Sequence, residues 1–295
     1  SAAAAAAAGG ALALPAGAVA EEPAVQLRTE LQRRLNETDI SKAGGTGLSG
    51  PSGFIPGWGP DDLYYPSWIE GRWRVTQTLV GYSLPQGNQF IANGNREVAD
   101  KVVQDQQNQL GKPVEFELRY VRTKRNNTVE DRAYNVESRT DAFAGRKVVR
   151  SVEYADVPDN TRAGSLKAGN AEDDPLLTTL VNFKGAVQKI FITAFQTEQD
   201  EAKQIWRGLA SQRTLFAAPG AGYNPLAVDE ETVTALRRGP AGGRGRLRLL
   251  GFLNPNDTLF FKAGNKAVSI ADYTLEYAYL GPIEPKAAAQ EAAAA

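Results

Sequence analysis

The chain has 295 residues, enough for one large or two small domains, each with its own core. Its 33 Lys and Arg nearly balance its 34 Asp and Glu, so a net charge of -1 gives no general attraction to nucleic acids or anionic membranes. The sequence contains no His, Cys or Met. This composition excludes disulfides, thiol nucleophiles, Ser-His-Asp triads and metal sites with the usual zinc, copper or haem ligands. It leaves binding, or chemistry based on carboxylate, Lys, Tyr or Ser side chains.

Residues 1–20 carry no charge and are mostly Ala. They end in Ala18-Val19-Ala20, followed by Glu21, and a small-x-small triplet before an acidic segment is typical of a signal-peptidase site. A membrane anchor and a disordered tail are the alternatives, but Gly and Pro interrupt the stretch and Ala is only weakly lipophilic. We expect residues 1–20 to be the remnant of a targeting segment.

Residues 21–60 are expected to form an amphipathic helix followed by a linker. Leu27, Leu31 and Leu35 recur at every fourth position, which predicts one apolar helical stripe. The stripe is narrow, so the helix either lies on the main domain or docks on a partner, in which case these three leucines are the contacts. Residues 43–60 contain seven Gly and three Pro, which indicates the linker.

Between residues 61 and 281 the dominant pattern has period two. Val114, Phe116, Leu118 and Tyr120 alternate with charged residues, which is typical of a strand with one face in water. One helix is expected over residues 95–110, capped by Asn95. Further strands are expected at 73–80, 147–154, 177–184, 188–197, 204–217, 231–236, 244–254, 258–263 and 273–279.

The segment Gly71-Arg72-Trp73 places a Gly-x-Trp motif at the head of the first of these strands. This motif resembles the signature of lipocalins and the wider calycins, whose Trp plugs the closed end of a barrel. A Trp in the core of any β-protein is the alternative interpretation. Many strands at short spacing predict an all-β domain over residues 61–281, an antiparallel sandwich or barrel with one or two short helices, and the resemblance implies an up-and-down barrel. Residues 282–295 are Ala- and Glu-rich and are expected to be a flexible tail.

A second resemblance covers residues 63–280. The segments at 63–73, 118–121, 129–135, 172–176 and 272–275 resemble an uncharacterised plant, algal and cyanobacterial family, which is described as a domain of unknown function. Plant members of that family are assigned to the chloroplast thylakoid lumen. The resemblance therefore implies a lumenal location, with residues 1–20 as the end of a transfer peptide, and it implies no catalytic residues.

Two dense acidic groups lie near strand ends, Glu130-Asp131-Arg132 and Glu172-Asp173-Asp174. Paired carboxylates serve glycoside hydrolysis or calcium binding, but neither the separation nor the ligand spacing that those sites need is visible. A local ion pair and a turn are the simpler interpretation. We therefore predict no catalytic residue and no metal ligand.

The stretch 237–248 holds five Arg in twelve residues. Arg244, Arg246 and Arg248 alternate with Gly and Leu, which places all three on one face of a strand. A solvated face is the favoured interpretation, and a surface for an anion or an acidic partner is the alternative. Nucleic acid is disfavoured by the net charge and by the lack of interleaved aromatic residues.

From the lumenal location that the resemblance implies, we expect a non-enzymatic accessory or assembly protein of a photosynthetic membrane complex, without a cofactor and peripheral to the membrane at most. The alternative is a barrel that carries an apolar pigment, quinone or lipid, and a carboxylate-based hydrolase is a third possibility. Packed and hollow barrels share the same alternation, and the ordinary aromatic content slightly favours a filled interior. The candidate lining residues of a hollow barrel are Trp73, Phe116, Tyr120, Phe191 and Phe195.

Overall fold

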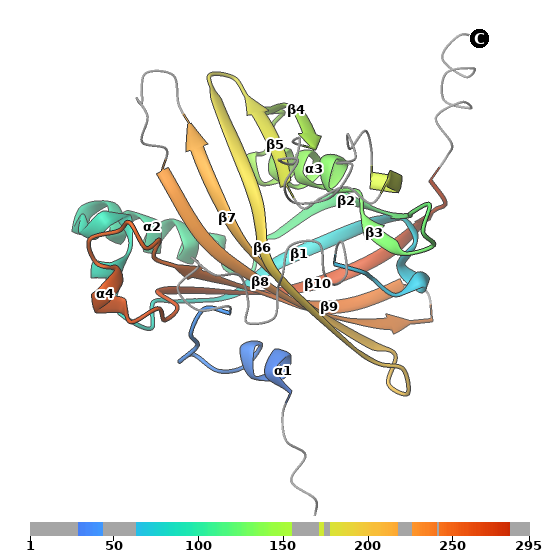
Figure 1. Cartoon of the computed structure of the whole chain (residues 1–295), viewed down its shortest axis with the longest axis horizontal. Helices are drawn as coiled ribbons and strands as arrows, with labels where there is room; N and C mark the ends of the chain where they lie inside the picture. Colours follow the sequence, from blue (N-terminus) through green and yellow to red (C-terminus); the bar gives the residue numbers. More distant parts are fainter. Residues whose placement is uncertain are drawn as a thin grey trace, which may run out of the picture.

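The computed structural model describes residues 29–43, 63–154, 171–173, 178–217, 226–240 and 242–283. Within these residues ten strands form one antiparallel sheet that curls into a half-barrel (Figure 1). The strands are β1 (Gly71–Ser83), β2 (Pro113–Arg122), β3 (Thr128–Glu130), β4 (Val149–Tyr154), β5 (Thr178–Phe183), β6 (Ala186–Asp200), β7 (Ile205–Ala217), β8 (Leu226–Gly239), β9 (Gly242–Phe252) and β10 (Ser269–Gly281).

Four α-helices and four 3₁₀ turns accompany the sheet in the described part of the chain. The α-helices are α1 (Glu30–Arg34), α2 (Arg96–Gln109), α3 (Arg132–Ala144) and α4 (Phe260–Ala263). The 3₁₀ turns are η1 (Ser67–Ile69), η2 (Asn88–Phe90), η3 (Ala92–Gly94) and η4 (Ala171–Asp173).

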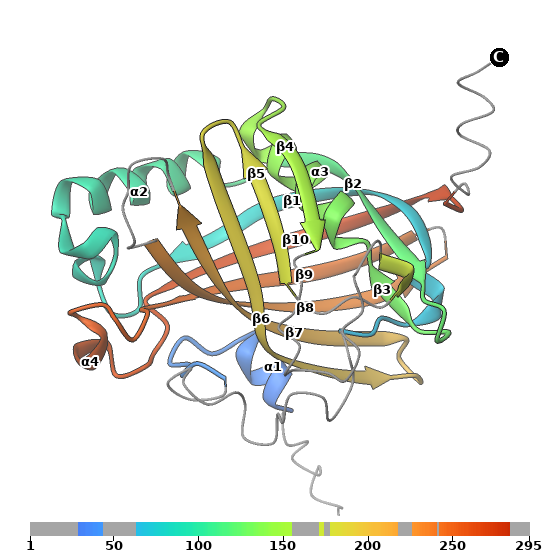
Figure 2. The ribbon, with the colours of Figure 1, turned by 45° about the horizontal axis from the view of Figure 1, so that its top comes forward.

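The strand order is that of an up-and-down meander. It runs β3-β2-β1-β10-β9-β8-β7-β6-β5-β4, so consecutive strands pair with each other except β3 and β4, and β1 pairs with β10. The predicted all-β class and antiparallel up-and-down order are therefore confirmed, and the arrangement is compatible with a lipocalin-like fold. The two edges of the sheet are β3 and β4, and α3 connects them and packs against both β2 and β4 (Figure 2).

Helix α3 docks by hydrogen bonding to the edge of β2 that β3 leaves unpaired. The side chain of Asn135 accepts from the backbone N of Arg119 at 2.7 Å and donates to its carbonyl oxygen at 3.0 Å. Ser138 Oγ accepts from the backbone N of Glu117 at 3.1 Å. Because an unpaired sheet edge exposes unsatisfied polar groups, these side chains replace the missing strand partner and hold the helix across the gap in the half-barrel.

The predicted helix at 95–110 is confirmed as α2, and the side chain of Asn95 accepts from the backbone N of Val98 as its cap. Two expectations are wrong. The strand expected at 258–263 is instead a turn followed by α4, because the Asp257 carboxylate accepts from the backbone N of Leu259 and begins a helical turn. Helix α3 was not expected, although Asp131 caps its start and Gly145, at φ 64°, ends it.

The sheet has an inner face, which carries Val75 and Phe116, and an outer face, which carries Val233 and Leu250. Residues 29–43, including α1, pack on the outer face, on the opposite side of the sheet from α3 (Figure 1). The inner face holds the largest buried cluster: Ile69, Trp73, Val75, Phe116, Leu118, Tyr120, Trp206, Leu236, Leu247, Leu275 and Tyr277.

Trp73 lies near the start of β1, where η1 leads the chain into the sheet. It is buried, and its indole Nε1 donates to the carbonyl oxygen of Ile69 at 2.6 Å. Its ring also contacts Tyr277 and Tyr279 in tilted, edge-on arrangements. The predicted burial of Trp73 at one end of the sheet is confirmed, whereas Trp58, expected outside the core, lies outside the described residues.

We predict that Trp73→Ala lowers the free energy of unfolding by about 3–5 kcal/mol, the usual cost of emptying an aromatic site in a core. Val80→Ala is the matched control, because Val80 is on the same strand but exposed, and it should cost less than about 0.5 kcal/mol. Urea denaturation of both variants measures the difference. Equal costs would contradict a structural role for the Gly-x-Trp motif.

Candidate functional site

A cavity of about 120 Å³ lies on the inner face of the half-barrel. Its walls come from α3 and from every strand except β4. The apolar part of the wall includes Val75, Phe116, Leu118 and Leu275. This volume is below the roughly 300–1,000 Å³ of ordinary small-molecule pockets, because large side chains fill most of the interior.

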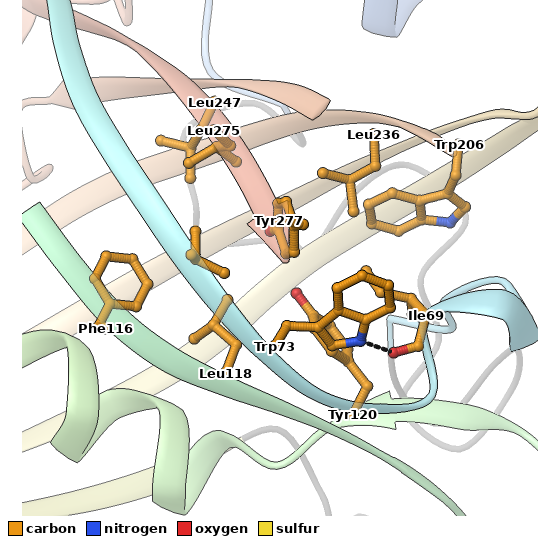
Figure 3. Close-up of a cluster of buried hydrophobic side chains, with 11 residues drawn as sticks. Ile69, Trp73, Phe116, Leu118, Tyr120, Trp206, Leu236, Leu247, Leu275 and Tyr277 are labelled. Carbon is orange, nitrogen blue, oxygen red and sulfur yellow. Dashed lines mark hydrogen bonds between the residues drawn. The ribbon is translucent and has the colours of Figure 1, made fainter. Parts of the chain in front are cut away.

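Aromatic side chains close the end of the cavity next to η1 (Figure 3). Tyr65 stacks on Trp206 with ring centroids 4.4 Å apart and meets Tyr120 edge-on at 4.9 Å. Trp206 Nε1 donates to the carbonyl oxygen of Tyr64 at 3.1 Å. Gly208 is required beside it, because a Cβ there would lie 2.3 Å from the Trp206 ring. Stacking and a hydrogen bond therefore fix the aromatic side chains at this end of the cavity.

Two buried tyrosines, Tyr120 and Tyr277, lie in the cavity wall. Burial raises the pKa of Tyr277 to about 12 and raises the pKa of Tyr120 well above its usual value. Both hydroxyls are therefore neutral at physiological pH, so the pair can donate and accept hydrogen bonds but supplies no phenolate base.

Polar groups from β1, β3 and α3 also reach the cavity. The Glu130 carboxylate accepts from Asn135 Nδ2 at 3.0 Å and lies 3.7 Å from the guanidinium of Arg139. That guanidinium sits over the Phe116 ring, 5.5 Å from its centroid. On the neighbouring strand, Gln77 is only 5% exposed and lines the cavity. The cavity is therefore amphipathic, with an apolar wall and a few polar groups.

Of the five predicted lining residues, the structure places four on the inner face of the sheet and one on the outer face. Phe116 and Tyr120 line the cavity, and Trp73 is buried in the cluster beside it. Phe195 pairs with Ala210, which lines the cavity, and therefore shares the inner face. Placing Phe191 inside was wrong.

Phe191 lies on the outer face because the alternation along β6 is interrupted. A bulge between Ile192 and Ala194 shifts the register with β7, and an extra residue at a bulge moves the following side chains to the other face. Residues 191 and 195 would share a face in a regular strand. Here Ile190 and Ile192 line the cavity in place of Phe191.

The outer face is covered by residues 29–43. Leu31 and Leu35 are buried against Leu209, Val233 and Leu250. Docking of these two leucines on a partner was therefore wrong, because the sheet itself is apolar beneath them and each such side chain contributes about 1.5–3 kcal/mol by burial here. Leu27 lies outside the described residues.

Buried ion pairs join this segment to β8. Arg34 pairs with Glu231, and Lys42 pairs with Asp229, which also accepts two hydrogen bonds from Arg213 at 2.7 and 2.8 Å. Burial alone would raise the pKa of Asp229, but the hydrogen bonds from Arg213 and Lys42 outweigh it, so this pKa lies below its usual value. Burial raises the pKa of Glu231 despite the nearby Arg34.

The three arginines predicted on one strand face do lie on the outer face, but in three different environments. Arg248 is buried, with its guanidinium 2.7 and 2.9 Å from the Asp272 carboxylate. Arg246 is half-covered and donates to the carbonyl oxygen of Leu35 at 3.2 Å. Arg244 is exposed. The solvated-face prediction was therefore wrong for Arg248, because the turn after α1 covers it.

Arg244 belongs to a surface groove of about 640 Å³ at the β8–β9 hairpin, which we call the arginine groove. Arg74, Arg237 and Arg238 also line it, and no described residue forms an ion pair with any of these four arginines. Glu276 is the single acidic residue in its described lining. The groove is therefore strongly basic, although the chain as a whole is nearly neutral.

The two acidic motifs of the sequence take part in hydrogen bonds within the fold. Asp131 caps α3, and the backbone carbonyl of Glu172 accepts from the backbone N of Lys124 at 2.9 Å. Across the described ranges, no three Asp or Glu side chains gather in a way that could hold a metal ion. No helix in those ranges is long and apolar enough to cross a bilayer.

Comparison with known families adds one finding. Residues 57–179 match the family described as Domain of unknown function (DUF6816). The matched segment contains β1 to β4, α2 and α3, and so includes Gln77, Phe116, Glu130 and Arg139 of the cavity. It also includes Arg74 of the arginine groove, but not the groove residues on β8 and β9. No curated protein and no solved structure matches the chain.

Sequence reasoning missed Gln77 and Arg139 for different reasons. Gln77 follows Trp73 and Val75 in the same inward row of β1, so its position was readable from the period-two pattern. Arg139 lies on α3, which was not expected. The capping signals of α3 were the available evidence for it.

We predict that Arg34→Met lowers the free energy of unfolding by about 3–5 kcal/mol at neutral pH, because it leaves the Glu231 carboxylate buried without its guanidinium partner. Without Arg34 the pKa of Glu231 in the folded state rises further above its unfolded value. A raised folded pKa means that stability falls as the pH rises from about 4.3, the ordinary Glu value, through the folded pKa. The deficit should therefore be smaller at acidic pH.

Arg33→Met is the matched control, since Arg33 lies on the same helix with exposed ion pairs to Glu30 and Glu37 and should cost less than about 1 kcal/mol. Adding Glu231→Leu to Arg34→Met should recover most of the loss. Denaturation at several pH values measures these effects. A pH-independent deficit would contradict the ion-pair explanation.

Proposed function

We propose that this protein is a non-enzymatic accessory or assembly protein of a photosynthetic membrane complex in the thylakoid lumen, and that the arginine groove binds an acidic segment of its partner. The observation that carries the proposal is the contrast between the two concave sites. The interior leaves about 120 Å³, whereas the groove offers about 640 Å³ lined by four arginines without ion pairs in the described structure.

Strand pairing strengthens the case for an anionic partner. Arg237 and Arg244 stand directly opposite each other in the β8–β9 ladder, and Glu276 stands opposite Arg244 on β10 without forming an ion pair with it in the described structure. Like charges in directly opposed positions destabilise a sheet. An acidic segment bound across them would relieve this repulsion and form charge-assisted hydrogen bonds with the guanidinium groups.

The groove floor favours an extended polypeptide. Gly239, Gly242 and Gly243 lie between the arginines and present no side chains. Gly242 also permits a close approach of β9 to β10, since a Cβ there would lie 2.2 Å from the carbonyl oxygen of Tyr277. The resulting shallow basic trough suits carboxylate side chains on an extended chain better than a compact apolar ligand.

The carrier alternative receives less support. A pigment, a quinone with its tail or a lipid exceeds the volume of the inner cavity, which is smaller than ordinary small-molecule pockets. A carboxylate-based hydrolase also receives less support. The Glu130 carboxylate in the cavity is engaged by Asn135 and Arg139.

We predict that a fluorescein-labelled hexaglutamate peptide binds the full chain and that Arg237→Gln with Arg244→Gln weakens this binding about tenfold. Two exposed ion pairs are worth up to about 1 kcal/mol each, and about 1.4 kcal/mol corresponds to tenfold. Binding should also weaken with added salt. Fluorescence anisotropy measures the affinity.

Arg146→Gln with Arg150→Gln is the matched control, because both residues are exposed, lie in or just before β4, and change the net charge by the same amount. Its affinity should equal that of the wild type. Equal binding of a neutral peptide, or preferential binding of vesicles that contain anionic lipid, would overturn the acidic-segment proposal.

The proposed location rests on the Ala-rich residues 1–20 and on the sequence resemblance, and it has its own test. The protein should be protected from protease in intact thylakoids after import into isolated chloroplasts, and the mature form should begin near Glu21 by intact-mass analysis. Recovery in the stromal fraction, or a mature protein that keeps residues 1–20, would contradict this prediction.

A further inference from the structure

The inner cavity holds a buried acceptor that the fold leaves unused. Gln77 is 5% exposed and lines the cavity, and its side-chain Oε1 accepts no hydrogen bond from any described residue. Leaving a buried acceptor unsatisfied costs roughly 1–3 kcal/mol, so such groups in native proteins call for a partner. Its neighbours in the inward row of β1, Val75 and Leu79, are apolar and fully consistent with a packed core.

A second unused group in the cavity lining lies on α3. The Nε of Arg139 is buried and donates to no acceptor in the described part of the chain, although the Nη2 of the same guanidinium lies 3.7 Å from Glu130. Arg139 lines the same cavity as Gln77. The cavity lining therefore includes an unused acceptor on β1 and an unused donor on α3.

The volume of the cavity suits a single ring. A cavity of about 120 Å³ is comparable to the engineered apolar cavity of about 150 Å³ that binds benzene. Its wall includes the Phe116 ring and the apolar side chains of Leu118 and Leu275, which favour an aromatic or flat apolar body.

We propose that the inner cavity binds a compact aromatic molecule that carries a hydroxyl group and a carboxylate or carbonyl oxygen. The hydroxyl donates to Gln77 Oε1, and the oxygen accepts from Arg139 Nε. The ring packs against Phe116. This site lies on the inner face of the sheet and is independent of the arginine groove on which the proposed function rests.

The test uses the full chain and four probes of one ring each: 4-hydroxybenzoate, benzoate, phenol and toluene. Calorimetric titration should give the tightest binding for 4-hydroxybenzoate, weaker binding for benzoate and phenol, and the weakest for toluene. The comparison of phenol with toluene tests the Gln77 contact in the unaltered protein, so it does not depend on a variant that folds.

Gln77→Leu should weaken binding of 4-hydroxybenzoate and phenol about tenfold, as expected for one buried hydrogen bond, and leave benzoate and toluene unchanged. Arg139→Met should instead weaken 4-hydroxybenzoate and benzoate. Thr78→Val is the matched control, since Thr78 is the next residue on β1 and faces the opposite side of the sheet. Gln77→Leu should also raise the thermal midpoint of the unliganded protein, because it removes an unsatisfied buried polar group.

Three outcomes would overturn the proposal. Failure of all four probes to bind at millimolar concentration would show that the cavity holds water only. An equal loss for all probes in Gln77→Leu would make Gln77 a packing residue. Binding of toluene as tightly as 4-hydroxybenzoate would mean that neither polar group contacts the ligand.

Discussion

The pairing of β1 with β10 is the constraint on which the rest of the structure depends. It joins residues 71–83 to residues 269–281 and merges β1 to β3 with the meander of β4 to β10 into one sheet. The same register brings Val75 opposite Tyr277 and Gln77 opposite Leu275, so it assembles the wall of the inner cavity from the two ends of the domain. Long-range strand pairing of this kind is slow to form, because the loop must close before its contacts stabilise it. Loss of this pairing would therefore remove both the cavity and the contacts of Trp73 with Tyr277 and Tyr279 on β10.

The two faces of the sheet are stabilised by different interactions. The inner face relies on aromatic and aliphatic packing, with Tyr120 and Tyr277 neutral in a low-dielectric interior. The outer face combines the apolar contacts of residues 29–43 with ion pairs around Asp229 and Glu231. Buried ion pairs contribute little net stability, but breaking one is costly. They therefore fix where residues 29–43 lie on the sheet, while the apolar contacts provide most of the favourable free energy.

Helix α3 both completes the sheet edge and supplies a polar side chain to the cavity. Its Asn135 and Ser138 complete the hydrogen bonding of the β2 edge, and the same helix carries Arg139 over the Phe116 ring. A helix that closes a sheet edge leaves a less regular interior than a strand would, since its side chains enter the barrel at a different spacing. The small amphipathic cavity beneath α3 is the consequence. The arginine groove shares strands with the cavity, but none of its four arginines lines the cavity, so the two proposed binding sites can be varied separately.

The sequence by itself determined the all-β class, the positions of most strands, the helix at 95–110 and the burial of Trp73, because period-two alternation and capping residues are local signals. It also placed Arg244, Arg246 and Arg248 on one face. Only the tertiary structure decided which of them is buried, since that depends on residues 29–43 packing on a surface about two hundred residues away in sequence. The bulge between Ile192 and Ala194 puts Phe191 on the opposite face of the sheet from Phe195, and no local sequence pattern indicated this bulge. The unpartnered Gln77 Oε1 likewise exists only because distant strands surround it, so the candidate ligand site is a property of the assembled sheet.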